Sequence, residues 1–339
     1  MATKKSFSLF DKLLYFVNSL CAAILLFAYF LPYISPKTVP LFSVLSLAVP
    51  LLIIINVGFF VYWLIRLKKY LILSGVVLGI GLVFSSPFFK ISGKKTFLND
   101  DVKVMSYNVR MFNFYKWIED EAVDEKIVEF INQKDPDILA IQEYHHSDKR
   151  NLQYPYSYFV PKSKHKNFGL AIFSKFPIIN KGSLDFKESA NNAIFIDIKK
   201  GKDTVRVYNV HLQSLKINPT KENFGQENSE KLIERLEIGF QKQATQTEQF
   251  LAHEKQWKGK KIVCGDFNNT AYSWVYRQIS KGKKDAFAQA GSGLGKSFNY
   301  VFPMRIDFIL TDPSSEINNY QTFKHKYSDH FPIMARVNW

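Results

Sequence analysis

Gly265-Asp266-Phe267-Asn268 follows the apolar run Lys261-Ile262-Val263-Cys264, whose β-branched residues predict a buried strand that ends at Gly265. Asp266 and Asn268 are two residues apart, so in an extended chain their side chains point to the same side. A carboxylate and an amide at the end of a core strand require a partner, because burying an unpaired charge is costly. A metal-bound phosphate and an attacking water would supply one. The alternative is a turn in which Asp and Asn cap the next helix.

Other apolar strands of the chain also end in polar side chains. These polar strand-end residues are Asn108, Glu143, His211, Asp266, Asn268, Asp307, Asp329 and His330. Strand ends meet at one rim of a sheet, where several carboxylates repel one another unless a cation lies among them. Carboxylate and amide oxygens are the ligands that Mg²⁺ prefers, with Mn²⁺ as the alternative ion. Such an ion can orient a phosphate ester and stabilise its leaving oxygen, while histidines act as donors or as a base.

Strands outnumber helices after residue 101, and the two do not alternate strictly. We expect strands at 102–109, 137–141, 156–160, 169–174, 193–198, 204–210, 261–264, 306–310 and 333–337. We expect helices at 120–133, 230–256 and 273–280. This pattern favours an α+β fold, a two-sheet β-sandwich flanked by helices, over a doubly wound parallel sheet.

The first ninety residues contain three long apolar runs, at about 13–34, 41–64 and 70–89. Each is near the length that crosses a hydrocarbon layer of ~30 Å as a helix. Two further runs follow the first directly, which favours an uncleaved span over a signal peptide. The sequence thus predicts a transmembrane region at 1–90 with three transmembrane helices, a polar linker at 91–101 and a soluble domain at 102–339.

The chain carries a formal net charge of +15, of which +7 falls in residues 1–90 and +8 in the remainder. A basic soluble half suits a nucleic acid, a phosphorylated ligand or an anionic membrane surface. Six Lys and Arg residues on one side of the three predicted spans against four on the other favour a cytoplasmic N-terminus. That orientation predicts a multi-pass inner-membrane protein with an extracytoplasmic domain. A hairpin plus a re-entrant segment would instead keep the domain inside.

Six short motifs carry a family resemblance. They are Ser106-Tyr107-Asn108, Gln142-Glu143, Asn209-Val210-His211-Leu212, Gly265-Asp266-Phe267-Asn268, Arg305-Ile306-Asp307-Phe308-Ile309 and Ser328-Asp329-His330. In this order they resemble the endonuclease/exonuclease/phosphatase superfamily, which has a fold like that of pancreatic deoxyribonuclease. The resemblance covers residues 102–339.

The resemblance also implies roles for the polar residues. It implies three metal ligands: Glu143 as the principal one, Asn108 beside it, and Asp329. It implies five catalytic residues: Asp266 for the attacking water, Asn268 and His211 for phosphoryl oxygens, and His330 paired with Asp307. Each residue taken singly has a structural alternative, such as a surface acid, a core histidine or a strand-end cap.

These expectations predict a membrane-anchored, Mg²⁺-dependent phosphoesterase that hydrolyses a phosphodiester or phosphoanhydride, as nucleases do. Water would attack phosphorus in line, without a covalent intermediate. One alternative is a lipid phosphate or phosphodiester hydrolase resembling sphingomyelinases or lipid pyrophosphatases. A second is a membrane adaptor without activity. The expected partners are a nucleic-acid or phospholipid-type substrate and, through the three spans, membrane lipid. The sequence points to no protein partner.

Overall fold

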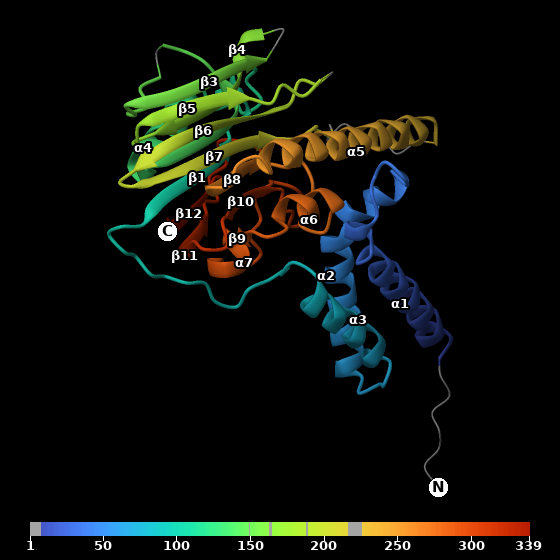
Figure 1. Ribbon diagram of the computed structural model, residues 1–339. Coiled ribbons are helices and arrows are strands. Elements are labelled where there is room, and N and C mark those ends of the chain that lie inside the picture. Colours follow the sequence, from blue (N-terminus) through green and yellow to red (C-terminus); the bar gives the residue numbers. More distant parts are fainter. Residues whose placement is uncertain (1–7, 149, 163–164, 188, 216–225) are drawn as a thin grey trace.

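Two six-stranded sheets pack face to face in the C-terminal part of the computed structural model (Figure 1), which describes residues 8–148, 150–162, 165–187, 189–215 and 226–339. The first sheet runs in the order β11 (Glu316–Thr322), β12 (Ile333–Asn338), β1 (Val102–Asn108), β2 (Ile138–His145), β4 (His165–Ser174), β3 (Tyr156–Lys162). The second runs β5 (Ile178–Ser183), β6 (Asn192–Lys200), β7 (Asp203–His211), β8 (Lys260–Asp266), β10 (Asp307–Thr311), β9 (Lys284–Asp285). Only β1 with β2 and β7 with β8 pair in parallel among these strands. The predicted two-sheet sandwich is therefore confirmed.

The main core fills the space between the two sheets, where β-branched side chains from both inner faces meet. Val104 and Ile172 of the first sheet share this cluster with Ile196, Val207 and Ile309 of the second, and all five are buried. Alternation along each strand sends the remaining apolar residues to the outer faces. Helices cover those faces: α4 (Val123–Lys134) covers the first sheet, while α5 (Gln226–Glu254) and α6 (Trp274–Ser280) cover the second.

The sequence analysis did not predict three of the strands, which are β5, β9 and β11. β5 is largely exposed and β9 has two residues, while β11 buries the polar Asn318 and Asn319, so none of the three shows the apolar signal of a buried strand. The expectation that Gly265 ends its strand was wrong, because β8 continues through Gly265 to Asp266. The backbone of Gly265 has φ +143°, and a Cβ there would lie 1.8 Å from the carbonyl oxygen of Val210. Glycine is required at this point because β7 approaches too closely for a side chain.

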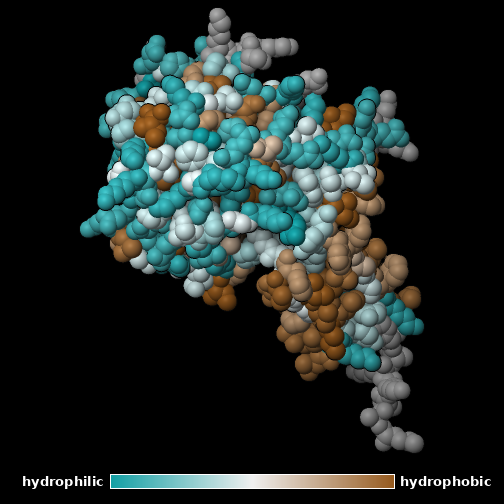
Figure 2. All heavy atoms as spheres, in the orientation of Figure 1, coloured by the Kyte–Doolittle hydropathy of each residue, from teal (hydrophilic) through white to brown (hydrophobic). Residues whose placement is uncertain are grey.

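Three antiparallel helices form an N-terminal bundle that projects from the sandwich (Figure 1): α1 (Leu9–Ala28), α2 (Val44–Ile65) and α3 (Leu71–Phe84). Figure 2 shows hydrophobic side chains over this bundle, in contrast to the hydrophilic surface of the sandwich. The segments Leu9–Tyr33 and Leu41–Ile65 are long and apolar enough to cross a membrane, by length and composition.

The third predicted span, 70–89, was wrong. The helix α3 has 14 residues, or about 21 Å at 1.5 Å per residue, which is short of the ~30 Å hydrocarbon layer. Ser85 is extended, and Pro87 two residues later cannot continue a helix. The apolar residue that follows, Phe88, packs with the cluster that contains Tyr272 of the sandwich. The sequence run was apolar partly because its end contacts protein.

Buried polar side chains join the three helices. Trp63 Nε1 donates to Asn18 Oδ1 at 2.8 Å, and Asn18 Nδ2 donates to Ser74 Oγ at 2.7 Å. Asn56 Nδ2 donates to the carbonyl of Leu52 at 2.9 Å, and its Oδ1 lies 3.3 Å from Ser74 Oγ. All four side chains are fully buried. These bonds hold the helices in one register, because apolar contacts alone would permit several.

The first turn of α2 is bonded directly to the sandwich. Pro50 lies inside α2 and has no N–H, so the carbonyl of Ser46, four residues earlier, lacks its helical donor. Thr270 Oγ1 donates to that carbonyl at 2.6 Å. Ser46 Oγ also donates to Asn269 Oδ1 at 3.1 Å. The loop that follows Asn268 therefore completes the hydrogen bonding of an N-terminal helix.

A second junction bonds the segment that follows α3 to the sandwich. Arg305 Nη2 donates to Ser86 Oγ at 2.8 Å, and Arg305 Nη1 bonds Asp285 Oδ2 at 2.7 Å. Arg305 also covers the ring of Phe287, which belongs to α7 (Ala286–Ala290), at 4.7 Å. Because Arg305 lies two residues before Asp307, both junctions hold chain segments that lead into the rim of strand ends.

Candidate functional site

Strand register brings the polar strand ends to one rim. In the second sheet, His211 of β7 and Asp307 of β10 are both direct neighbours of Asp266 on β8. In the first sheet, Asn108 of β1 is paired with Gln142 of β2, immediately before Glu143. The two sheets pack so that these ends face each other across the sandwich. Residues from β1, β2, β7, β8 and β10 are thereby brought together, as the sequence pattern predicted.

Asp266 is the centre of this rim. Its Oδ2 accepts hydrogen bonds from Asn108 Nδ2 at 3.1 Å and Asn268 Nδ2 at 3.2 Å, and its Oδ1 accepts from the backbone N–H of Asn268 at 2.8 Å. The backbone of Asn268 is left-handed, with φ +50°, so a turn rather than an extended chain puts the two side chains together. Burial raises the pKa of Asp266 to about 7, and the nearby His330 cation opposes that rise. A carboxylate of this pKa is suited to take a proton at neutral pH.

Asp307 and His330 form a buried pair beside Asp266. Nδ1 of His330 lies 2.9 Å from Asp307 Oδ2, and Nε2 of His330 lies 3.6 Å from Asp266 Oδ2. Burial lowers the pKa of His330, but the charges of Asp307 and Asp266 outweigh it and hold that pKa well above its usual range. His330 is therefore an imidazolium at neutral pH. It presents a positive charge next to the carboxylate at the centre of the rim.

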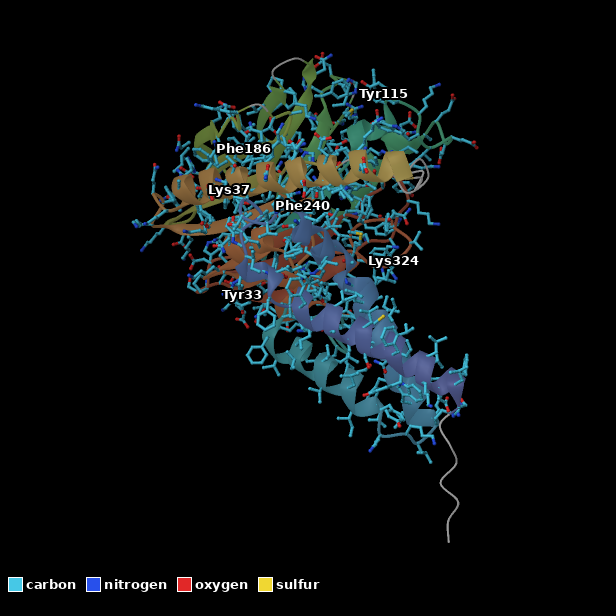
Figure 3. All side chains as sticks on the ribbon, turned by 90° about the vertical axis from the view of Figure 1, so that its right-hand side faces the viewer. Tyr33, Lys37, Tyr115, Phe186, Phe240 and Lys324 are labelled. Carbon is cyan, nitrogen blue, oxygen red and sulfur yellow. The ribbon has the colours of Figure 1, made fainter. Side chains whose placement is uncertain are left out.

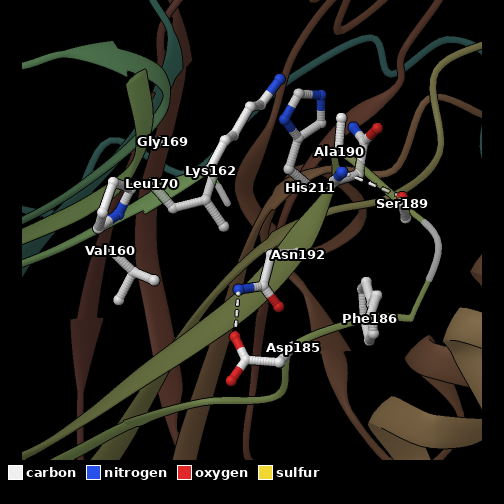
Figure 4. Close-up of a pocket in the computed structure, with 12 residues that line it drawn as sticks. Val160, Lys162, Gly169, Leu170, Asp185, Phe186, Ser189, Ala190, Asn192 and His211 are labelled. Carbon is white, nitrogen blue, oxygen red and sulfur yellow. Dashed lines mark hydrogen bonds between the residues drawn. The ribbon is translucent and has the colours of Figure 1, made fainter. Parts of the chain in front are cut away.

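His211 lies in a different electrostatic setting. Its pKa is well below the usual value, because burial and the nearby charges of Lys162 and His330 all disfavour a cation. Its Nε2 is 3.6 Å from Asp266 Oδ2, longer than a hydrogen bond. The neutral ring lines a cavity of about 320 Å³ together with Lys162, Asn191 and Asn192. Figure 4 shows the Lys162 side chain reaching toward His211 at one end of this cavity. A neutral donor and a cation thus meet beside the rim.

Glu143 and Asp329 provide the acidic part of the rim in the first sheet. The backbone of Glu143 has φ +52°, at an irregularity in the pairing of β2 with β4. The pKa of Glu143 is raised, first by burial and then by the charge of Asp329, although an Asn108 hydrogen bond opposes the rise. Two carboxylates that repel each other are what a hard divalent cation relieves, whereas Asn108 presents its Nδ2 to the carboxylates and its Oδ1 accepts from the backbone N–H of Arg110. These side chains fit a magnesium or manganese ion.

A second trio, Asp266, Asp307 and His330, has ligand atoms within 4.8 Å of one another and could also hold a metal ion. Both nitrogens of His330 already face carboxylates as donors. A metal ion would have to displace a proton from that ring and break the pair with Asp307. The trio is therefore better suited to hydrogen bonding than to coordination.

Several rim residues were not found in the sequence. Arg110 Nε lies 3.3 Å from Asp329 Oδ2, and its backbone N–H donates to Asn108 Oδ1 at 3.1 Å. Asn209 Nδ2 donates to carbonyls of both β2 and β4, and its Oδ1 accepts from Gln142 Nε2 at 2.7 Å. Asn209 and Gln142 were quoted only within motifs, yet they join the two sheets directly under the rim. Lys162 ends an edge strand, where nothing local distinguishes it from other surface lysines.

The two-sheet sandwich with its polar rim is a phosphoesterase-like fold. Residues 105–330 match the description "Endonuclease/Exonuclease/phosphatase family", and residues 11–88 match a "Domain of unknown function (DUF8431)". The chain belongs to the endonuclease/exonuclease/phosphatase family. No curated protein matches the sequence.

Solved structures with the same fold include three instructive cases. The human Nocturnin catalytic domain with bound sulfate is 18% identical with a TM-score of 0.51, covering 70% of this chain and 93% of that one. The endonuclease/exonuclease/phosphatase from Bacteroides vulgatus is 19% identical, TM-score 0.54, covering 70% and 98%. The mannosyl-6-phosphatase of Bacteroides thetaiotaomicron is 19% identical, TM-score 0.51, covering 70% and 100%. At such identities the likeness establishes the fold alone.

Proposed function

We propose that this protein is a membrane-anchored, divalent-metal-dependent phosphodiesterase of the nuclease type. The observation that carries the proposal is the single rim at which Asp266 bonds Asn108 and Asn268 and lies within 3.6 Å of His330 and of His211. These buried polar groups converge from both sheets, and a phosphate ester with its metal ion would offset much of the cost of burying them.

The rim suggests a division of labour for hydrolysis. Asp266 orients the attacking water and accepts its proton, because its carboxylate has a pKa near neutrality. His330 stays cationic and Asp307 fixes its tautomer, so Nε2 stabilises negative charge on the phosphoryl group. The neutral His211 and the amide of Asn268 donate to non-bridging oxygens. A divalent ion held by Glu143, Asn108 and Asp329 would polarise the phosphate and stabilise the leaving oxygen.

Membrane anchoring is supported by the two long apolar helices, α1 and α2. The N-terminal end of α1 and the sandwich lie at opposite ends of the bundle (Figure 1), and the first helix is preceded by lysines. We therefore propose that α1 and α2 enter the membrane and that the sandwich lies at its surface. A reporter enzyme that works only outside the cytoplasm, fused after Trp339, tests the side on which the sandwich lies. With the N-terminus in the cytoplasm, two spans keep the sandwich there too, so the reporter is expected to be inactive. An active reporter from a stably expressed fusion would show that α3 crosses the membrane as well.

A lipid phosphate hydrolase is the second candidate, because the first turn of α2 bonds the loop directly after Asn268. This contact holds the rim close to whatever surface the bundle enters. A lipid headgroup or lipid diphosphate would then reach the rim without leaving the membrane.

The test uses the full chain in detergent, since α2 is bonded to the loop beside the rim and a truncated sandwich would lose those bonds. Plasmid DNA, a chromogenic phosphodiester and a lipid diphosphate are each incubated with Mg²⁺. We expect hydrolysis of the phosphodiesters that is lost in Glu143→Gln. The matched control, Glu125→Gln on the exposed face of α4, is expected to keep full activity. Turnover of the lipid alone would favour the second candidate. No turnover and no metal binding by calorimetry would leave a membrane adaptor.

A further inference from the structure

An exposed group of aromatic rings lies beside the rim on the chain that follows β1. Phe114, Tyr115 and Trp117 are 52%, 58% and 43% exposed. The rings of Phe114 and Tyr115 are 5.2 Å apart, and those of Tyr115 and Trp117 are also 5.2 Å apart. We call these three residues the aromatic platform. Three adjacent large rings exposed to water are costly, so such a surface indicates a binding site.

The aromatic platform is connected to the rim at both ends. The Arg110 guanidinium lies over the Trp117 ring at 4.4 Å, and Arg110 Nε lies 3.3 Å from Asp329 Oδ2. At the other end, Phe114 packs at 4.5 Å against the ring of His145, two residues after Glu143 on β2. A ligand whose phosphate lies at Glu143 and Asp329 would therefore have its neighbouring group over the rings.

The backbone under the aromatic platform is strained and tightly held. Arg110, Met111, Phe112 and Asn113, which form the short helix η3 (Arg110–Asn113), all have φ between +44° and +60°. Non-glycine residues avoid this region, and a run of them persists only where the surroundings enforce it, as at ligand clamps. Asn113 supplies that enforcement: its side chain accepts from the N–H of Ile118 at 2.9 Å and donates to the Ile118 carbonyl at 2.8 Å. The rings are thus presented on a rigid loop.

The position of the aromatic platform argues against contact with a bilayer. Figure 3 shows Tyr115 at the end of the sandwich farthest from α1, α2 and α3. A surface at that distance from the bundle does not reach the membrane that the bundle would enter. Two cations lie beside the rings: Arg110, which is paired with Asp329, and Lys116, whose ion pair with Glu121 is exposed to water and can exchange for a phosphate.

We propose that the aromatic platform stacks on a nucleobase of a single-stranded nucleic acid whose adjoining phosphodiester lies at the rim. This inference rests on the proposed phosphodiesterase function and adds its substrate class. Rings stack on every base because each base has a π-face, so the platform would bind without reading sequence. Arg110 would be a specificity-determining residue, since it holds both Trp117 and the acidic side of the rim.

The test compares two substrates that differ only in their bases. Full-length protein in detergent with Mg²⁺ is given a single-stranded oligonucleotide or an abasic oligomer with the same length and backbone. We expect the wild type to cleave the oligonucleotide with a kcat/KM at least about fivefold higher than that for the abasic oligomer. This factor corresponds to the binding free energy of one stacked base, about 1 kcal/mol. Tyr115→Ala and Trp117→Ala are each expected to remove most of this preference through KM. Tyr115→Ala, which alters a ring that does not contact Arg110, should leave cleavage of the abasic oligomer within about twofold of wild type.

Two variants complete the comparison. Trp117→Phe retains a ring and is expected to retain the preference. Tyr156→Ala removes another exposed ring, which lies six residues before Lys162 on β3 and so about 20 Å away along the strand. This control variant should cleave both oligomers as the wild type does.

The outcomes separate this inference from the proposed function. Equal cleavage of both oligomers by the wild type would overturn the stacking role and leave the phosphodiesterase standing. The stacking role would also be overturned if Trp117→Ala lost the same fraction of its kcat/KM on both oligomers while Tyr115→Ala kept the wild-type kcat/KM. That result would show that the rings only support Arg110. Loss of binding to anionic vesicles in Tyr115→Ala would assign the rings to lipid. No hydrolysis of any phosphoester would instead refute the function itself.

Discussion

Replacing Thr270 by valine tests the junction between α2 and the rim. The Oγ1 of Thr270 donates to the Ser46 carbonyl at 2.6 Å and accepts from the N–H of Tyr272 at 3.3 Å. Valine has the same shape but no hydroxyl. Because Pro50 cannot supply the helical bond, the Ser46 carbonyl would then be buried without a donor.

The magnitude follows from that lost bond. Leaving a buried carbonyl unsatisfied costs about 1–3 kcal/mol. For a domain of this size each kcal/mol shifts the unfolding midpoint by about 2–4 °C, so we expect a decrease of about 2–12 °C. Thr270 lies two residues after Asn268, so the loop should also shift. A displacement of even ~1 Å in a reacting group can lower kcat by about 100-fold, and we expect a decrease of at least about fivefold here.

Thr311→Val is the matched control. Thr311 lies at the end of β10 and is fully buried, but within the described residues its hydroxyl has no hydrogen-bond partner. The same substitution there removes a buried polar atom without breaking a bond, so stability should stay equal or rise. The assay is thermal unfolding of both full-length variants in one detergent, followed by kcat on a phosphodiester.

Equal midpoints for Thr270→Val and Thr311→Val would refute the reasoning, because the junction would then contribute nothing. A loss of stability without a loss of kcat would restrict the junction to a structural role.

The remaining predictions concern the rim and its support. Asp307→Asn should lower kcat about 10- to 150-fold in steady-state assays, since a charged hydrogen bond to His330 is worth about 1.5–3 kcal/mol; an unchanged kcat would show that His330 acts without its carboxylate. Chelation should abolish activity and Mg²⁺ should restore it, and Glu143→Gln should weaken Mg²⁺ binding in calorimetry; activity that survives chelation would remove the metal from the proposal. Arg305→Met should cost about 3–5 kcal/mol in denaturant unfolding, because it leaves the buried charge of Asp285 without a counter-ion, and Asp285→Asn added to it should restore part of that loss by removing the charge while keeping an acceptor for the Ala288 N–H; full stability of the single variant would contradict this.

The sequence alone determined the sandwich and singled out most of the polar residues at the strand ends. Alternating apolar strands that end in carboxylates, amides and histidines carry both signals locally, because period-two patterning and strand-end chemistry are properties of short segments. Asp266 and Asn268 could be singled out without any knowledge of their neighbours. The long apolar helices α1 and α2 were equally readable, since their length and composition suffice.

Only the tertiary structure decided which distant groups meet. The end of the third apolar run packs on the sandwich, so hydropathy alone overestimated that span. Arg110, Lys162 and the aromatic platform became visible as parts of the site only when β1, β2 and the β3–β4 hairpin were brought together. The bond from Thr270 to the carbonyl freed by Pro50 joins residues 224 positions apart. Contacts of that separation depend on how the whole chain packs, and no local pattern encodes them.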